Sequence, residues 1–103
     1  MFVHKVIMTR PAQDILFENE VTEFIDILTQ LKDLRTQSSG FISDGETLSD
    51  DKLIYTKWNN WQTKDDWINY CKINEEITAQ YTRMRIAYNE QNNITTTIED
   101  SEV

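Results

Sequence analysis

The sequence predicts an α+β domain whose elements follow the order β-α-β-β-α-β, with four strands in one antiparallel sheet. Two segments with apolar residues at spacings of three and four predict helices. Four segments rich in β-branched and aromatic residues predict strands. The chain has 103 residues and 39% hydrophobic residues, which is the size and composition of one domain. We assign that domain to residues 1–99 and an acidic tail to residues 100–103.

The first strand is predicted over residues 2–10, where Pro11 ends a run of large apolar and β-branched residues. Alternation places two sets of side chains on opposite faces: Phe2, His4, Val6 and Met8 on one, and Val3, Lys5, Ile7 and Thr9 on the other. Both faces are substantially apolar, which is typical of a central strand in a covered sheet. Residues 11–19 form a connector for which we predict no regular structure.

The clearest helix is predicted over residues 20–37. Its apolar stripe consists of Val21, Phe24, Ile25, Leu28, Leu31 and Leu34. Asn19 is the expected N-cap, because its side-chain oxygen can accept a hydrogen bond from the first turn. The run Ser38-Ser39-Gly40 is a typical stop signal.

A hairpin follows, with strands predicted over 41–48 and 52–61 around the polar turn Ser49-Asp50-Asp51. Because Gly45 interrupts the first of these strands, we expect a β-bulge there. The second strand places Tyr55, Lys57 and Trp61 on one face.

The second helical region begins at Thr63-Lys64-Asp65-Asp66, which resembles a capping box. Asn74 is expected to interrupt it, and Asn92-Asn93 to end it. Residues 94–98 alternate apolar residues with Thr and predict the fourth strand.

This order, with both helices on one face of the sheet, is the ferredoxin-like arrangement. The opposite face would be open to water in a monomer, although the first and third predicted strands carry apolar residues on both faces. A large exposed apolar sheet face indicates an interaction surface. The pattern therefore predicts a homodimer that associates through this sheet face.

Composition argues against several classes of partner. Lys and Arg total 10 against 18 Asp and Glu, so the net charge of −8 opposes binding to nucleic acid. No apolar run approaches the roughly 20 residues of a membrane span, so we expect no membrane association. Cys71 is the only cysteine, which excludes an intrachain disulfide and favours a cytoplasmic location. No phosphate-binding loop or metal-ligand spacing occurs, so neither a cofactor nor a metal is expected.

The run from Gly40 to Leu48, together with Trp61, Trp67 and Tyr70, resembles the antibiotic-biosynthesis monooxygenase-like family of dimeric α/β barrels. The resemblance implies a dimer with a pocket between sheet and helices, and one branch of the family oxidises electron-rich aromatics such as quinols without a cofactor. Asp44 is an extra residue relative to the family pattern, and Tyr70 stands where Trp is common. The family spans many activities, so the resemblance predicts the fold more sharply than the reaction.

The heme-degrading branch of this family places an Asn on the first strand and a His after the second helix begins. His4 and Gln80 stand loosely at those positions, and no histidine follows residue 4. A heme-binding relative is therefore the weakest of the functional hypotheses.

The candidate catalytic residues are His4, as a base that deprotonates a phenolic substrate, and Tyr70. The candidate substrate-binding residues are Trp58, Trp67 and Tyr55, which could wall a pocket for a flat molecule. The simpler interpretations are a structural histidine, core packing for Trp61 and Trp67, and solvated surface cations at Lys5, Lys57, Arg83 and Arg85. Two main functions stay open: a cofactor-independent monooxygenase acting on an aromatic or quinol-type compound, and a non-catalytic dimer that binds a small hydrophobic ligand or serves as a scaffold.

Overall fold

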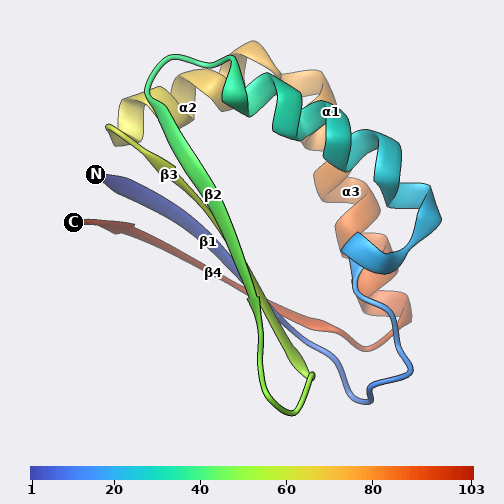
Figure 1. Cartoon of the computed structure of the whole chain (residues 1–103). Helices are drawn as coiled ribbons and strands as arrows, with labels where there is room; N and C mark the ends of the chain where they lie inside the picture. Colours follow the sequence, from blue (N-terminus) through green and yellow to red (C-terminus); the bar gives the residue numbers. More distant parts are fainter.

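A computed structural model describes the whole chain, residues 1–103. Four eight-residue strands form one antiparallel sheet in the order β2-β3-β1-β4 (Figure 1). They are β1 (Phe2–Thr9), β2 (Phe41–Leu48), β3 (Ile54–Trp61) and β4 (Thr95–Glu102). The α+β, ferredoxin-like prediction is confirmed, and the central position of β1 agrees with its two apolar faces.

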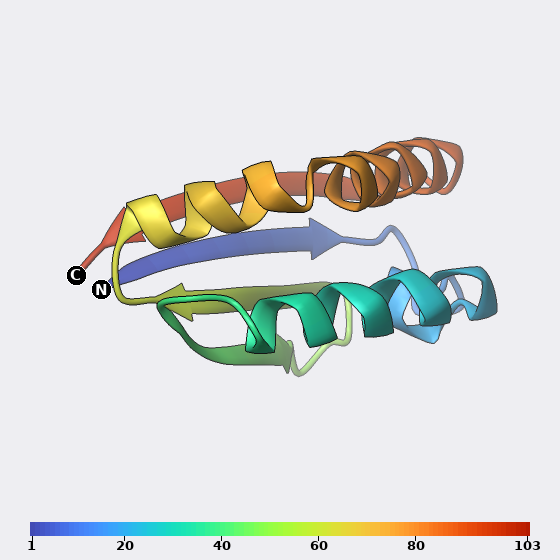
Figure 2. The ribbon, with the colours of Figure 1, turned by 90° about the horizontal axis from the view of Figure 1, so that it is seen from above.

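All helices lie on one face of the sheet (Figure 1). They are η1 (Glu18–Glu20), η2 (Thr22–Phe24), α1 (Ile25–Thr36), α2 (Lys64–Ile73) and α3 (Glu75–Gln91). Seen from above, α1 runs over the β2–β3 side, whereas α2 and α3 run over the β1–β4 side (Figure 2). None of these helices combines the length and the apolar character that crossing a membrane would need.

The predicted strand faces are correct, and they build the core. Phe2, Val6 and Met8 of β1 and Tyr55 and Trp61 of β3 are buried beneath the helices. Thr63 is the N-cap of α2, because its Oγ1 accepts a hydrogen bond from the backbone N–H of Asp66, but the return bond of the predicted capping box is replaced by one from the Thr63 hydroxyl to Asp66 Oδ2. The break at Asn74 separates α2 from α3 as expected.

The first helix begins later than predicted. Residues 18–24 form two 3₁₀ turns separated by extended backbone at Val21, and Asn19 caps nothing. The reason is burial, since Phe17, Glu18 and Phe24 are each about 1% exposed and the chain bends to bring all three inward. The connector therefore belongs to the core.

The irregularity in β2 lies between Phe41 and Ser43, and the predicted bulge at Gly45 is wrong. Gly45 pairs regularly with Trp58, whose indole occupies the space that a Cβ at position 45 would need. The glycine is thus required by close packing. The shift near Ile42 leaves Asp44 opposite Asn59, on the face that carries the helices.

The fourth strand is longer than predicted. Residues 100–102, expected in a frayed tail, pair with β1 so that Glu102 lies opposite Phe2 and Asp100 opposite His4. Because β4 is an exposed edge strand, its acidic side chains remain in water and discourage pairing with another edge.

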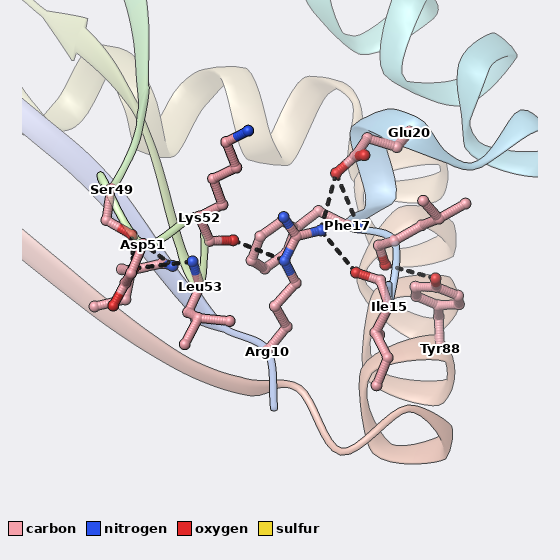
Figure 3. A network of polar contacts seen from close by, with 11 residues as sticks. Arg10, Ile15, Phe17, Glu20, Ser49, Asp51, Lys52, Leu53 and Tyr88 are labelled. Atoms are coloured by element: carbon pink, nitrogen blue, oxygen red, sulfur yellow. Dashed lines mark hydrogen bonds and ion pairs between the residues drawn. The ribbon is translucent and has the colours of Figure 1, made fainter. Parts of the chain in front are cut away.

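Arg10 fixes the connector to the hairpin turn (Figure 3). Its side chain is only 5% exposed and lies over the Phe17 ring, 4.4 Å from the centroid. Nε donates to the Lys52 carbonyl at 2.8 Å, and Nη1 donates to the Ile15 carbonyl at 2.7 Å and to Glu20 Oε1 at 3.3 Å. The buried guanidinium of Arg10 therefore orders the connector. The connector in turn places Glu18, the residue after Phe17, against the sheet.

We expect Arg10→Met to lower the free energy of unfolding by roughly 2–4 kcal/mol, because it leaves buried carbonyls without donors. Urea denaturation measures this loss. Arg83→Met, which removes an exposed arginine of α3, is the matched control and should change stability by less than about 0.5 kcal/mol. Equal effects of the two substitutions would contradict the role assigned to Arg10.

Candidate functional site

Two adjoining cavities lie between the helices and the sheet. The first, which we call the chamber, has a volume of about 380 Å³ and is lined by all three α-helices and by β1, β3 and β4. The second, which we call the groove, has a volume of about 560 Å³ and lies between α1 and strands β2 and β3. Four residues line both cavities: Leu28, Arg35, Lys57 and Asn59.

His4 and Asp100 form a pair on the chamber wall. His4 Nδ1 lies 2.6 Å from Asp100 Oδ1, and the imidazole stacks on Trp67 with ring centroids 4.8 Å apart. A carboxylate only accepts hydrogen bonds, so the proton of the neutral ring sits on Nδ1 and the lone pair on Nε2. Nε2 has no protein partner, which leaves it available to take a proton from a ligand.

Burial lowers the pKa of His4 from its ordinary value near 6.5, and the neighbouring Asp100 carboxylate opposes this shift without cancelling it. The neutral form of His4 therefore persists below the pH at which a free histidine gains its proton. The folded state binds fewer protons than the unfolded chain in that window, so this group's contribution to stability falls as the pH drops below 6.5.

A buried polar cluster joins the sheet to the helices beside the chamber. Tyr81 of α3 donates to Glu18 Oε1 at 2.7 Å, and Lys57 Nζ lies 3.2 Å from the same oxygen. Lys57 also donates to the Tyr81 hydroxyl. Burial lowers the pKa of Lys57 against the pull of Glu18, and burial together with Glu18 raises the pKa of Tyr81 well above its ordinary value. The charge of Lys57 is therefore neutralised by Glu18 within the cluster.

A second ion pair neutralises Arg35, another cation that lines the chamber. Arg35 of α1 donates two hydrogen bonds to Asp44 of β2, at 3.1 and 2.9 Å. This parallel pairing is the strong geometry of an arginine with a carboxylate, and it ties α1 to the edge strand.

Arg85 is the chamber cation that remains free. Its side chain is 8% exposed, it lines the chamber, and its guanidinium lies over the Tyr81 ring at 5.5 Å without a carboxylate partner. Of the three cations that line the chamber, Arg35 and Lys57 are paired with carboxylates, so Arg85 is the one left to bind an anionic group, although the chain as a whole carries a charge of −8. The site therefore favours an anionic group on its ligand.

The structure divides the predicted site residues between the two cavities. His4, Trp67 and Tyr70 line the chamber and Tyr55 lines the groove, whereas Trp58, which borders the groove, lies opposite Lys5 in the register of the other sheet face. Burial raises the pKa of the Tyr70 hydroxyl against the influence of the nearby Arg35, so the hydroxyl stays protonated, and it donates a long hydrogen bond to the Leu31 carbonyl at 3.5 Å. The Tyr55 hydroxyl is occupied by a hydrogen bond to Glu46 at 2.7 Å.

Sequence reasoning missed the roles of four polar residues of the site. Asp100 was assigned to the tail, and the signal that would have found it is the register that continues β4 opposite His4. Glu18 lies in a connector without periodicity, and its partner Tyr81 is 63 residues away. Lys57 and Arg85 were considered only as surface cations, and both line the chamber.

We predict that the single histidine of this chain titrates below pH 6.5, and that Asp100→Asn lowers its pKa further by removing the carboxylate that favours the charged ring. The Hε1 proton resonance of the only imidazole reports this directly. The control is Asp65→Asn, an exposed carboxylate of α2 that should leave the resonance unchanged. A pKa that rises in Asp100→Asn would contradict the assigned pair.

No protein-family model matches the sequence, and no curated protein matches it. Three solved structures share its fold over nearly the whole chain. A putative antibiotic biosynthesis monooxygenase from Deinococcus radiodurans has a TM-score of 0.60 at 11% identity and covers 100% of this chain and 92% of its own. A monooxygenase from Streptomyces coelicolor, solved with the ligand nanaomycin D, has a TM-score of 0.56 at 12% identity. The match covers 99% of this chain and 88% of the monooxygenase chain. A dimeric ferredoxin-like protein from an uncultured marine organism has a TM-score of 0.55 at 12% identity. The match covers 100% of this chain and 94% of that protein's chain. The resemblance seen in the sequence is thus confirmed at the level of the fold, which is that of the antibiotic-biosynthesis-monooxygenase-like ferredoxin-fold proteins.

Proposed function

We propose that the chamber binds a planar aromatic molecule with an acidic phenol or enol hydroxyl, and that the protein acts on it as a cofactor-independent monooxygenase. The observation that carries this proposal is the His4–Asp100 pair stacked on Trp67 within the chamber that also holds the free guanidinium of Arg85. A base with an open lone pair and a fixed cation suit a ligand that loses a proton and becomes an anion.

Each residue has a defined task in this proposal. His4 Nε2 removes the hydroxyl proton, and Asp100 holds the ring in the required tautomer and stabilises its charged form. Arg85 stabilises the oxyanion, and Tyr70 remains a neutral hydrogen-bond donor. The resulting anion is electron-rich and can react with dioxygen directly. In an anthrone, the methylene carbon would become a carbonyl with one oxygen atom, and the second oxygen would leave as water with the two hydrogens.

The alternative is a protein that binds the same molecule without changing it. The free Arg85 and the aromatic Trp67 would serve binding alone equally well. The heme-binding hypothesis has less support, because His4 is the only histidine and already contacts Asp100 and Trp67.

We further propose that two copies associate through the sheet face opposite the helices. That face carries Val3 and Ile7 of β1 and Trp58 of β3 on its two central strands, a pattern suited to burial in an interface. The dimeric state named for one structure of the same fold supports this assembly. A cytoplasmic location belongs to the same proposal and is supported by the single cysteine.

We expect the protein to accelerate oxygen consumption by dithranol, a dihydroxyanthrone, above the rate without protein. His4→Gln should reduce the turnover number about a hundredfold or more, because it removes the general base, and Tyr70→Phe should also reduce it. An oxygen electrode measures turnover, and quenching of tryptophan fluorescence measures binding. Gln80→Ala, at an exposed position of α3, is the control.

Binding of dithranol without any turnover in the wild type would select the non-catalytic alternative. Turnover that is unchanged in both His4→Gln and Tyr70→Phe would show that the assigned catalytic residues are wrong.

The dimer proposal predicts a mass twice the 12.2 kDa of the chain in light scattering after gel filtration. Ile7→Lys should yield monomers, because it places a charge at the centre of the proposed interface. Ile86→Lys, at an exposed position of α3 on the helical side, should remain dimeric. A wild-type monomer, or a dimer that tolerates Ile7→Lys, would refute the interface.

A further inference from the structure

We infer that the groove is a second subsite for the same ligand, so that the site takes an elongated molecule with an acidic hydroxyl at one end and an amine or hydroxyl donor at the other. This inference rests on the proposed function, because it uses the chamber as the subsite for the acidic end. It adds which chemical group the ligand carries at its second end, because the chamber alone defines only the acidic end.

The two cavities meet along a common wall. Leu28 and Arg35 of α1 and Lys57 and Asn59 of β3 line both. The groove is the larger space, about 560 Å³ against about 380 Å³, so a ligand confined to the chamber would leave more than half of the available volume unused. A ligand that spans both cavities would pass along this shared lining, under α1.

The charges of the shared wall are already neutralised. Arg35 is held by Asp44, and Lys57 by Glu18. The free cation of the site is therefore Arg85, which lines the chamber and not the groove. An anionic end of a ligand is favoured only in the chamber.

The groove instead offers hydrogen-bond acceptors. Glu18 lines it, is 1% exposed, and has an oxygen, Oε2, without any partner. Glu46 lines it and accepts one hydrogen bond, from Tyr55. A buried carboxylate oxygen without a donor is costly, and a ligand that supplies the donor recovers that energy.

One groove cation has no carboxylate partner. Lys32 lines the groove and is exposed on α1, so water screens its charge. Neither Glu18 nor Glu46 is paired with it. The acceptors of the groove thus remain open to a donor on the ligand, and an ammonium group suits them best because a charged donor forms the stronger hydrogen bond.

A matched pair of probes tests the inference. Both are biphenyls with a para-hydroxyl on one ring, and the far ring carries an aminomethyl group in one probe and a methyl group in the other. We expect the aminomethyl probe to bind about tenfold more tightly, as measured by quenching of tryptophan fluorescence. Glu46→Gln should reduce this advantage, because it removes one of the two groove carboxylates, Glu18 and Glu46, that would accept from the ligand, whereas Glu76→Gln, which removes an exposed carboxylate of α3, should preserve it in full.

Equal affinities for the two probes, or an advantage that Glu46→Gln leaves unchanged, would overturn the second subsite. The variant Arg85→Met tests the chamber separately from the groove. Thermal unfolding first checks that this variant is folded. If Arg85→Met weakens both probes alike, the chamber assignment stands whichever result the groove gives. If neither probe is weakened, the proposed function fails, and with it the ligand that spans both cavities.

Discussion

The structure depends on a buried salt bridge that is also a hydrogen-bonded cluster. Glu18, Lys57 and Tyr81 come from a 3₁₀ turn, a central strand and the longest helix, and they meet around one carboxylate oxygen. Desolvating a carboxylate and an ammonium is expensive, and the loss of either partner leaves the other buried and unpaired. The cluster therefore fixes how far α3 and the connector stand from the sheet. That separation is what keeps a chamber on one side of Lys57 and a groove on the other.

The distribution of charge around this cluster explains how an acidic chain can present a free cation in its chamber. Each cation on the wall between the cavities faces a carboxylate, Lys57 with Glu18 and Arg35 with Asp44. Arg85 is the buried cation that is left without one, and it lies in the cavity that also contains the base His4. Net charge influences solubility and long-range attraction, whereas the affinity of a site depends on the few groups that a ligand touches after water is displaced.

Much of the fold could be predicted because its signals are local. The alternation in β1 identified the buried face that carries Phe2 and His4, and Thr63 identified the start of α2. The errors fell where a distant partner overrides local preference. Residues 100–102 have weak strand propensity and form a strand because β1 offers a free edge. Gly45 resembled a bulge, but the indole of Trp58 is the reason for that glycine.

The order of elements, the faces of the strands and the fold follow from local patterns in the chain, and so do three side chains of the chamber: His4, Trp67 and Tyr70. Periodicity and capping act within a few residues, so they can be read directly from the sequence. Folding in three dimensions is what brings Asp100 to His4 and Glu18 to Lys57, and what leaves Arg85 without a carboxylate. These pairings join residues as far as 96 positions apart. Charges acquire their partners through space, and no spacing along the chain encodes which ones remain unpaired.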